Sequence, residues 1–240
     1  MSRRKKSNKS LLSLIFIVFL LLGYNFYGDK IEEVILEKTG SYASYDIQNI
    51  PSYSGKEYII INNNEPLFED KYKTDKSFET YSSLDMLGRS GTAFANIGVD
   101  LLPTLERTSI GSVKPTGWHT VKYDIIEGKY LYNRCHLIGY QLTGENANKK
   151  NLITCTRQMN IGVMLDYENM VRQYVEKTND HVLYRVTPIF LEDNLLATGV
   201  QMEGLSVSDN GKSIKFNIFV YNVQDGIEID YKTGNSSLAK

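Results

Sequence analysis

Histidine, cysteine and proline are scarce in this chain. Its 240 residues include 3 histidines, 2 cysteines and 5 prolines, while 42% are hydrophobic and 23% charged. The Cys-x₂₋₄-Cys spacing typical of structural zinc sites does not occur, so such a site is disfavoured. Low-complexity tracts and internal repeats are also lacking. The composition therefore indicates an ordinary globular domain with accessory segments.

A general surplus of positive charge is missing too. Five of the 27 basic residues precede Asp29, which leaves 22 basic against 28 acidic residues, or −6, for residues 29–240. This balance argues against a surface that binds polyanions throughout. It is compatible with a local basic groove.

The first 28 residues combine a basic cluster with a long uncharged run. We expect a cytoplasmic basic tail at 1–9, a transmembrane signal-anchor at 10–28 and a polar stalk at 29–55. The strictly apolar part is followed by GYNFYG, which is a poor cleavage site, so we predict an uncleaved anchor. The remainder of the chain would then lie outside the cell membrane. A cleaved signal peptide and a secreted product are the alternative.

The body of the chain, residues 56–232, shows a strand-rich pattern and is followed by a C-terminal tail at 233–240. The turn SDNGK predicts a hairpin, and an i, i+3, i+7 pattern predicts a helix over 161–177. Residues 82–98 have helical spacing interrupted by glycines, which indicates helix or turn. The fold class is therefore α+β, with a mainly antiparallel sheet core. We expect strands at 58–61, 129–138, 151–155, 181–190, 194–207 and 213–223.

The segment from Asn133 to Asn160 holds His136, both cysteines and several amides. Thiol catalysis is disfavoured, because Cys135 and His136 are neighbours on a predicted strand and would point to opposite faces. The cysteines form either a disulfide or a pair of small buried thiols. An asparagine oxygen with water can hold Mg²⁺ beside a phosphate, and an imidazole can then deprotonate water. A packed or surface histidine without a chemical role is the other reading.

The same segment resembles the DNA/RNA non-specific endonucleases of the ββα-metal class, especially the Gram-positive branch with streptococcal DNases and the membrane-anchored DNA-entry nuclease. That family has an Asp-Arg-Gly-His signature, an Asn-rich strand, and a helix with a metal-binding Asn and a Glu. Here NRCH, KKNLITCTRQMN and DYENM match these parts. The likeness extends over about residues 56–232. Asn133 and Cys135 stand where the signature has Asp and Gly.

The resemblance implies a role for each matching residue. His136 is expected to be the general base, Asn160 the direct Mg²⁺ ligand, and Glu168 the carboxylate that orders the waters of the metal. On a continuous helix Asn160 and Glu168 would lie roughly two turns apart, offset by about 80°. Asn151 and Arg134 are expected to support catalysis. Arg89 and Arg157 are the expected phosphate contacts. Because the body is acidic, a local basic path is also needed to bind the substrate, and Lys149 and Lys150 are candidates for it.

The implied activity is a Mg²⁺-dependent endonuclease, with Mn²⁺ as the alternative metal. It would cut DNA, with RNA as an alternative substrate, largely without sequence preference, and leave 5′-phosphates outside the cell membrane. No protein partner is indicated. The rival class is a catalytically weak or inactive nucleic-acid-binding surface protein of the same fold, because an amide at Asn133 cannot stabilise an imidazolium by charge.

Overall fold

The computed structural model describes residues 44–239, and most of its strands join in one sheet. Within this range seven strands pair in the order β1-β2-β9-β8-β7-β4-β3. Each neighbouring pair is antiparallel except β1–β2. The predicted α+β class with a mainly antiparallel sheet is therefore confirmed. The strands are β1 (Ser44–Tyr45), β2 (Tyr58–Ile61), β3 (Phe78–Tyr81), β4 (Ala93–Ile97), β7 (Val182–Ile189), β8 (Gly199–Ser206) and β9 (Lys215–Tyr221).

Two smaller sheets and several helices complete the described part of the chain. The pair β5 (Tyr132–His136) and β6 (Leu152–Thr156) is antiparallel, as is the pair β10 (Ile227–Ile229) and β11 (Ser236–Leu238). β11 lies within the segment treated above as a C-terminal tail. The helical elements are η1 (Asn62–Asn64), η2 (Asp70–Tyr72), η3 (Val99–Leu101), α2 (Tyr140–Thr143), η4 (Lys149–Asn151), α3 (Arg157–Ile161) and α4 (Val163–Thr178).

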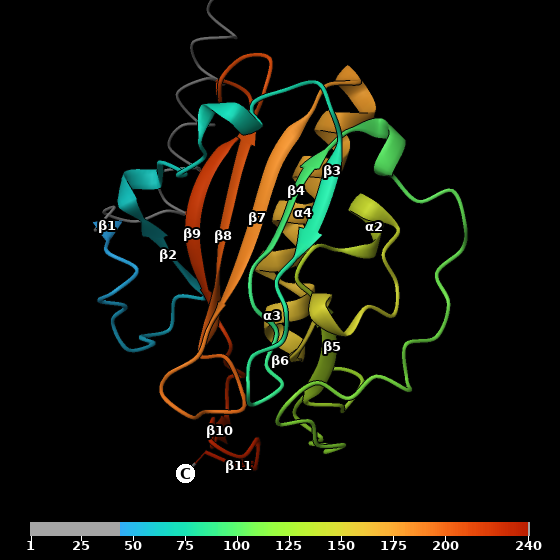
Figure 1. Ribbon diagram of the computed structural model, residues 1–240. Helices are drawn as coiled ribbons and strands as arrows, with labels where there is room; N and C mark the ends of the chain where they lie inside the picture. Colours follow the sequence, from blue (N-terminus) through green and yellow to red (C-terminus); the bar gives the residue numbers. More distant parts are fainter. Residues whose placement is uncertain (1–43, 240) are drawn as a thin grey trace, which may run out of the picture. The chain divides into compact units, whose positions relative to one another are not determined.

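Helix α4 covers one face of the large sheet, as Figure 1 shows. Its Val171 and Val175 are fully buried in the same core cluster as Val182 of β7 and Ile218 of β9. Cys135 of β5 and Cys155 of β6 belong to this cluster as well. The β5–β6 pair is thus anchored by the main core, which matters because an isolated two-stranded hairpin is marginally stable at best.

The β8–β9 hairpin forms as its turn sequence predicts. Asn210 and Gly211 have φ of 53° and 83°, the left-handed region that Asn and Gly adopt most readily. Along β9, Phe216, Ile218 and Val220 alternate into the core beneath α4. Residues of the opposite face, such as Phe219, pack in a small separate cluster with Ile61 and Tyr221.

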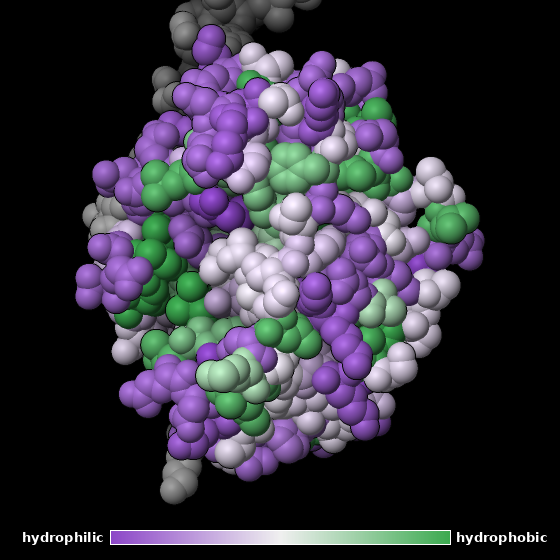
Figure 2. All heavy atoms as spheres, in the orientation of Figure 1, coloured by the Kyte–Doolittle hydropathy of each residue, from purple (hydrophilic) through white to green (hydrophobic). Residues whose placement is uncertain are grey.

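In Figure 2 hydrophobic residues gather on the left over β1 and β2, while hydrophilic ones are interspersed elsewhere on that face.

The reading of residues 82–98 as helix or turn was wrong over its second half. A turn does occur, where the Gly88 amide donates to the Asp85 carbonyl at 2.9 Å. The following residues instead form β4, which pairs with β3 and β7. Ala93, Ala95 and Ile97 are fully buried at a spacing of two residues. This is the period of a strand, which the preceding glycines and small residues obscured.

The helix predicted over 161–177 is present but broken. α3 ends at Ile161 and α4 begins at Val163, with Gly162 at φ −91° and ψ −121° between them. A Cβ atom at Gly162 would lie 2.7 Å from the Gln158 carbonyl oxygen, so the close approach requires glycine. Asn160 therefore sits on a short helix of its own, and the two-turn spacing from Glu168 expected for a continuous helix does not apply.

The predicted basic tail and membrane anchor, residues 1–28, lie outside the described residues. Among residues 44–239 the helices are all too short or too polar to cross a bilayer.

Candidate active site

A cleft of about 300 Å³ opens where β5, α2, α3 and α4 meet, and we call it the His136 cleft. Three residues that the sequence predicted, His136, Asn160 and Glu168, come from three different elements and line it together. A fourth, Arg107, enters from the long loop between η3 and β5. The polar lining residues are Arg107, His136, Tyr140, Gln141, Asn160 and Glu168.

His136 ends β5 and is held in one orientation. Its Nε2 donates to the carbonyl oxygen of Asn146 at 2.7 Å, and Nη2 of Arg107 lies 3.4 Å from Nδ1. A carbonyl only accepts, so Nε2 carries the proton and Nδ1 keeps its lone pair. Burial lowers the pKa of His136, and the charge of Arg107 lowers it further, against the raising effect of the bond to Asn146. The arrangement therefore favours a neutral imidazole that can accept a proton at Nδ1.

Glu168 lies on α4 with its carboxyl group buried in the cleft. Burial raises its pKa to about 7, against the lowering effects of the Gln141 hydrogen bond to Oε2 at 3.4 Å, the charge of Arg107 and a hydrogen bond from the backbone of Gly139. A Cβ atom at Gly139 would lie 2.3 Å from Oε2, which only a glycine at this position avoids. A carboxyl group that is desolvated and weakly bonded retains the capacity to accept further hydrogen bonds or to face a cation.

Asn160 contributes a second oxygen to the cleft. Its half-buried side chain lines the cavity and makes no hydrogen bond to any of residues 44–239. Within the same residues, no group of three or more His, Cys, Asp or Glu side chains could hold a metal ion by itself. An amide oxygen and a carboxylate are hard donors, which suit a cation that keeps much of its own water. The donor set thus fits Mg²⁺ or Mn²⁺ better than a metal that needs a full protein cage.

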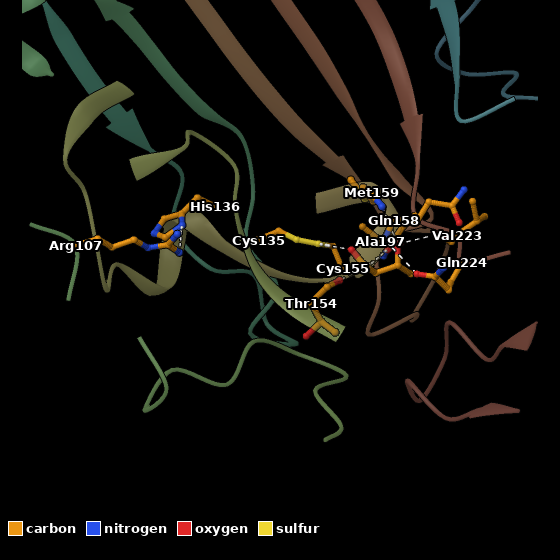
Figure 3. The surroundings of a disulfide bond; sticks show 12 residues. Arg107, Cys135, His136, Thr154, Cys155, Gln158, Met159, Ala197, Val223 and Gln224 are labelled. Carbon is orange, nitrogen blue, oxygen red and sulfur yellow. Dashed lines mark hydrogen bonds between the residues drawn. A yellow bond between two sulfur atoms is a disulfide. The ribbon is translucent and has the colours of Figure 1, made fainter. Parts of the chain in front are cut away.

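The cysteines lie on the other side of β5 from the cleft. Cys135 and Cys155 form a disulfide across β5 and β6, with a Cα–Cα distance of 5.9 Å, and both are fully buried. Figure 3 shows the disulfide directed away from His136, which turns toward Arg107. Of the two readings left open by the sequence, the disulfide is the one found. Neither sulfur lines the His136 cleft.

Comparison with known proteins agrees with this geometry. Residues 69–208, more than half of the chain, match the sequence model of the DNA/RNA non-specific endonuclease family. The chain belongs to this family. It is therefore a nuclease, and its substrate is nucleic acid.

Solved nuclease structures have the same fold. NucA from Streptococcus agalactiae without metal superposes with a TM-score of 0.68 at 26% identity, covering 80% of this chain and 92% of NucA. The magnesium-bound form of NucA gives 0.65 at 26% identity, covering 74% and 85%. Sda1 nuclease with bound zinc gives 0.58 at 26% identity, covering 68% and 81%.

Asn151 of the nuclease lies behind the cleft, where it is fully buried. Its Oδ1 accepts from the amide of Ile138 and its Nδ2 donates to the carbonyl of Ile138, both at 2.9 Å. These two bonds hold the chain between His136 and Gly139 in place. The supporting role expected for Asn151 thus has a structural basis, although its side chain does not line the His136 cleft.

Arg134 does not line the cleft either. Its Nε donates to the carbonyl of Val113 and its Nη2 to that of Gly111 at 2.9 Å. Its guanidinium lies over the ring of Trp118, 3.9 Å from the centroid. Arg134 therefore fastens the loop between η3 and β5, the same loop that delivers Arg107. These bonds are consistent with a positioning role for Arg134, and its support of catalysis stays a prediction.

Arg89 is bonded within the nuclease through Nε and Nη1, and its contact with a phosphate stays a prediction. It donates from Nε to Asp85 at 2.7 Å, and from Nη1 to the carbonyls of Glu192 and Asn194 at 2.8 and 3.0 Å. Its guanidinium also stacks on Phe190. The sequence could not separate this internal clamp from a substrate contact, because both require an arginine near a glycine-rich turn.

Arg157 begins α3 and lies outside the His136 cleft. Its Nε is buried and has no hydrogen-bond partner among residues 44–239. The same holds for Nδ2 of Asn133, the amide that replaces the signature carboxylate. Contact of Arg157 with a phosphate stays a prediction.

Lys149 and Lys150 are exposed on η4, and Lys149 lines a second cleft beside the first. Arg107, in contrast, was missed by the sequence analysis. It stands in an irregular loop, LERTSIGSV, where no periodicity or turn signal indicates the direction of a side chain. Only the fold of this loop over α2 brings it to His136.

Proposed function

We propose that this nuclease is a divalent-metal-dependent endonuclease that hydrolyses DNA phosphodiesters, largely without sequence preference, and leaves 5′-phosphates. RNA is the alternative substrate. The observation that carries the proposal is the His136 cleft itself. There a neutral imidazole whose Nδ1 keeps its lone pair, an unbonded amide oxygen and a buried carboxyl group face the same cavity.

His136 supplies the base. Its Nδ1 takes a proton from the water that attacks phosphorus, and the bond from Nε2 to the Asn146 carbonyl stabilises the imidazolium that results. Neutrality at rest matters, because a protonated ring could not accept this proton. The lowered pKa of His136 keeps the neutral form available at neutral pH and somewhat below.

Asn160 and Glu168 would hold the metal, Asn160 directly and Glu168 through the waters that a hard cation retains. When bound, the cation neutralises developing charge on the phosphate and the leaving oxygen. The magnesium-bound NucA and zinc-bound Sda1 structures support a divalent metal for this chain. The oxygen donors favour Mg²⁺, with Mn²⁺ as the alternative.

Arg107 would steer the phosphate. Its guanidinium lies within 3.4 Å of His136 Nδ1, and its remaining N–H groups can donate to non-bridging oxygens. A phosphate in the cleft would draw this guanidinium from Nδ1 and leave the lone pair to the attacking water. Contacts with the sugar-phosphate backbone carry no base information, which accounts for the proposed lack of sequence preference.

The proposed site of action is outside the cell membrane, with the N-terminal segment as anchor. The basic cluster and uncharged run of residues 1–28 support this location, as does the Cys135–Cys155 disulfide, because disulfides persist in oxidising compartments. Release after cleavage of that segment is the alternative.

Degradation of supercoiled plasmid by the full chain tests the activity. We expect cleavage with Mg²⁺ or Mn²⁺ and none with EDTA, with a 5′-phosphate on each product, detectable because a ligase accepts the ends. Cleavage that persists in EDTA would rule out the metal. Retarded but intact DNA would instead favour the binding-only alternative, in which Asn133 has cost the protein its activity.

A further inference from the structure

A second cleft of about 320 Å³ lies beside the His136 cleft, and we call it the Lys149 cleft. It is lined by Lys149 and Leu152 from η4 and β6 and by Lys114 from the loop that also carries Arg107. The register of β5 and β6 places Leu152 directly opposite His136. The two clefts therefore share the β5–β6 hairpin and the same loop.

The charge of the Lys149 cleft is of one sign. Lys114 and Lys149 are its charged lining residues, and within residues 44–239 neither forms an ion pair. The larger open depression of about 480 Å³ along α4 differs, because Asp166 and Lys177 line it together. In a chain whose body carries −6, two lysines without carboxylate partners around one cavity favour an anionic ligand.

Side-chain hydrogen bonds hold the backbone around the Lys149 cleft in place. Ser90 donates to the carbonyls of Lys149 and Leu152 at 3.0 and 2.9 Å, which joins the turn before β4 to η4 and β6. On the other side, Arg134 holds the carbonyl of Val113, a lining residue next to Lys114. Both ammonium groups are thus carried by backbone that is fixed relative to His136.

We propose that the Lys149 cleft is a subsite for a backbone phosphate of the bound strand, a short distance from the linkage that is cut. The inference rests on the proposed nuclease activity and deepens it. A strand that presents one phosphate to His136 and runs over the β5–β6 pair would meet the two lysines of the Lys149 cleft. Lys114 and Lys149 bind, and Arg134 positions the wall that carries Lys114.

Binding of a fluorescent DNA duplex in EDTA tests the subsite without any cleavage. We expect Lys114→Met and Lys149→Met each to weaken binding at low salt and to reduce the slope of log K against log salt by about 0.9, the worth of one phosphate contact. Lys212→Met is the matched control, because this exposed lysine belongs to the segment between β8 and β9. Figure 1 shows the β8–β9 turn at the opposite end of the sheet from β5 and β6. The slope of this variant should equal that of the unaltered chain.

Cleavage then locates the phosphate. On a strand with a single neutral methylphosphonate, the unaltered nuclease should spare one linkage at a fixed distance from the modification. That protection should fade in Lys114→Met and Lys149→Met, with KM affected more than kcat, and persist in Lys212→Met. Unchanged salt slopes in both lysine variants, or no protected linkage beyond the modified one, would overturn the subsite. Failure of the proposed function shows separately, as absence of cleavage by the unaltered chain, and the salt slopes still decide on the subsite.

Discussion

Two regions of this nuclease each bury a glutamate near an arginine, and they differ in how completely the groups are bonded. On the outer face of the large sheet, Arg185 of β7 donates to both oxygens of Glu203 of β8, at 2.6 and 2.8 Å. Glu203 also accepts from the Leu67 amide at 2.9 Å, and Arg185 donates to the Leu67 carbonyl at 2.7 Å. Both oxygens of Glu203, and Nε and Nη2 of Arg185, therefore have partners.

In the His136 cleft the corresponding groups are held apart. Arg107 reaches His136 Nδ1, and the side chain that donates to the carboxyl group of Glu168 is Gln141, at 3.4 Å. Burial raises the pKa of Glu168 to about 7, and the hydrogen bonds and charge around it only partly offset this rise. In the first region the polar groups of Arg185 and Glu203 are hydrogen-bonded to each other and to the backbone of Leu67. In the second region polar groups that line the cleft remain available to bind a ligand. Polar groups that face a cavity with few hydrogen-bond partners thus distinguish the candidate active site from the Arg185–Glu203 pair, which only stabilises the fold.

The largest effect should come from the base. His136→Ala is expected to lower the cleavage rate by about 10²–10⁴-fold, the usual worth of general-base catalysis, with the melting temperature little changed. His119→Ala is the control, because His119 is exposed and donates only to the Thr233 carbonyl. Near-normal cleavage by folded His136→Ala would remove His136 from the mechanism.

Removing the ion pair between Arg185 and Glu203 should lower stability rather than activity. Glu203→Ala leaves the Arg185 guanidinium without its carboxylate, and we expect unfolding free energy to fall by about 3 kcal/mol. Below the unfolding transition its kcat should stay normal. The matched control is Glu176→Ala, whose ion pair with Arg172 is exposed and worth about 0–1 kcal/mol. Equal losses in the two variants, measured by urea unfolding, would contradict the contrast between the regions.

Asn151→Ala should change both properties. It leaves the buried amide and carbonyl of Ile138 unpaired, so we expect a loss of about 2 kcal/mol in unfolding free energy. Because Ile138 follows the base closely, kcat should also fall while KM changes less. A fall in kcat without any loss of stability would mean that Asn151 takes part in the chemistry and is not a clamp.

The smallest effect concerns pH. The folded pKa of His136 lies below its ordinary value of about 6.5, so the folded state disfavours the charged ring. The unfolded chain then binds more protons between the two pKa values, and stability is lost as pH falls through about 6.5 toward the folded pKa. The melting temperature of the unaltered chain should therefore drop more over this interval than that of His136→Gln. Parallel curves would show that the folded pKa of His136 is not lowered.

Much of the fold could be predicted because its signals are local. Short β-type runs, alternation of apolar and polar residues, and turn residues act within a few positions of the chain. They were enough to predict Tyr58–Ile61, β9 and the hairpin at SDNGK. β4 was misread because small residues and glycines weaken its period, and its burial depends on pairing with β3 and with β7, which is far away in sequence. The break at Gly162 was missed because a single glycine within a helical pattern is commonly tolerated.

The fold class could be predicted from the sequence because periodicities and turn signals are properties of neighbouring residues, and the motif resemblance indicated the family and the three residues that gather in the His136 cleft. The remaining contacts became visible only in the folded chain. There Arg89 and Arg134 donate to backbone carbonyls, Arg107 reaches the imidazole, Cys135 and Cys155 form a disulfide away from the cleft, and Lys114 and Lys149 line one cavity. The physical reason is that a long side chain has donors for a protein carbonyl or a phosphate alike, and its partner is chosen by segments that meet only when the chain has folded.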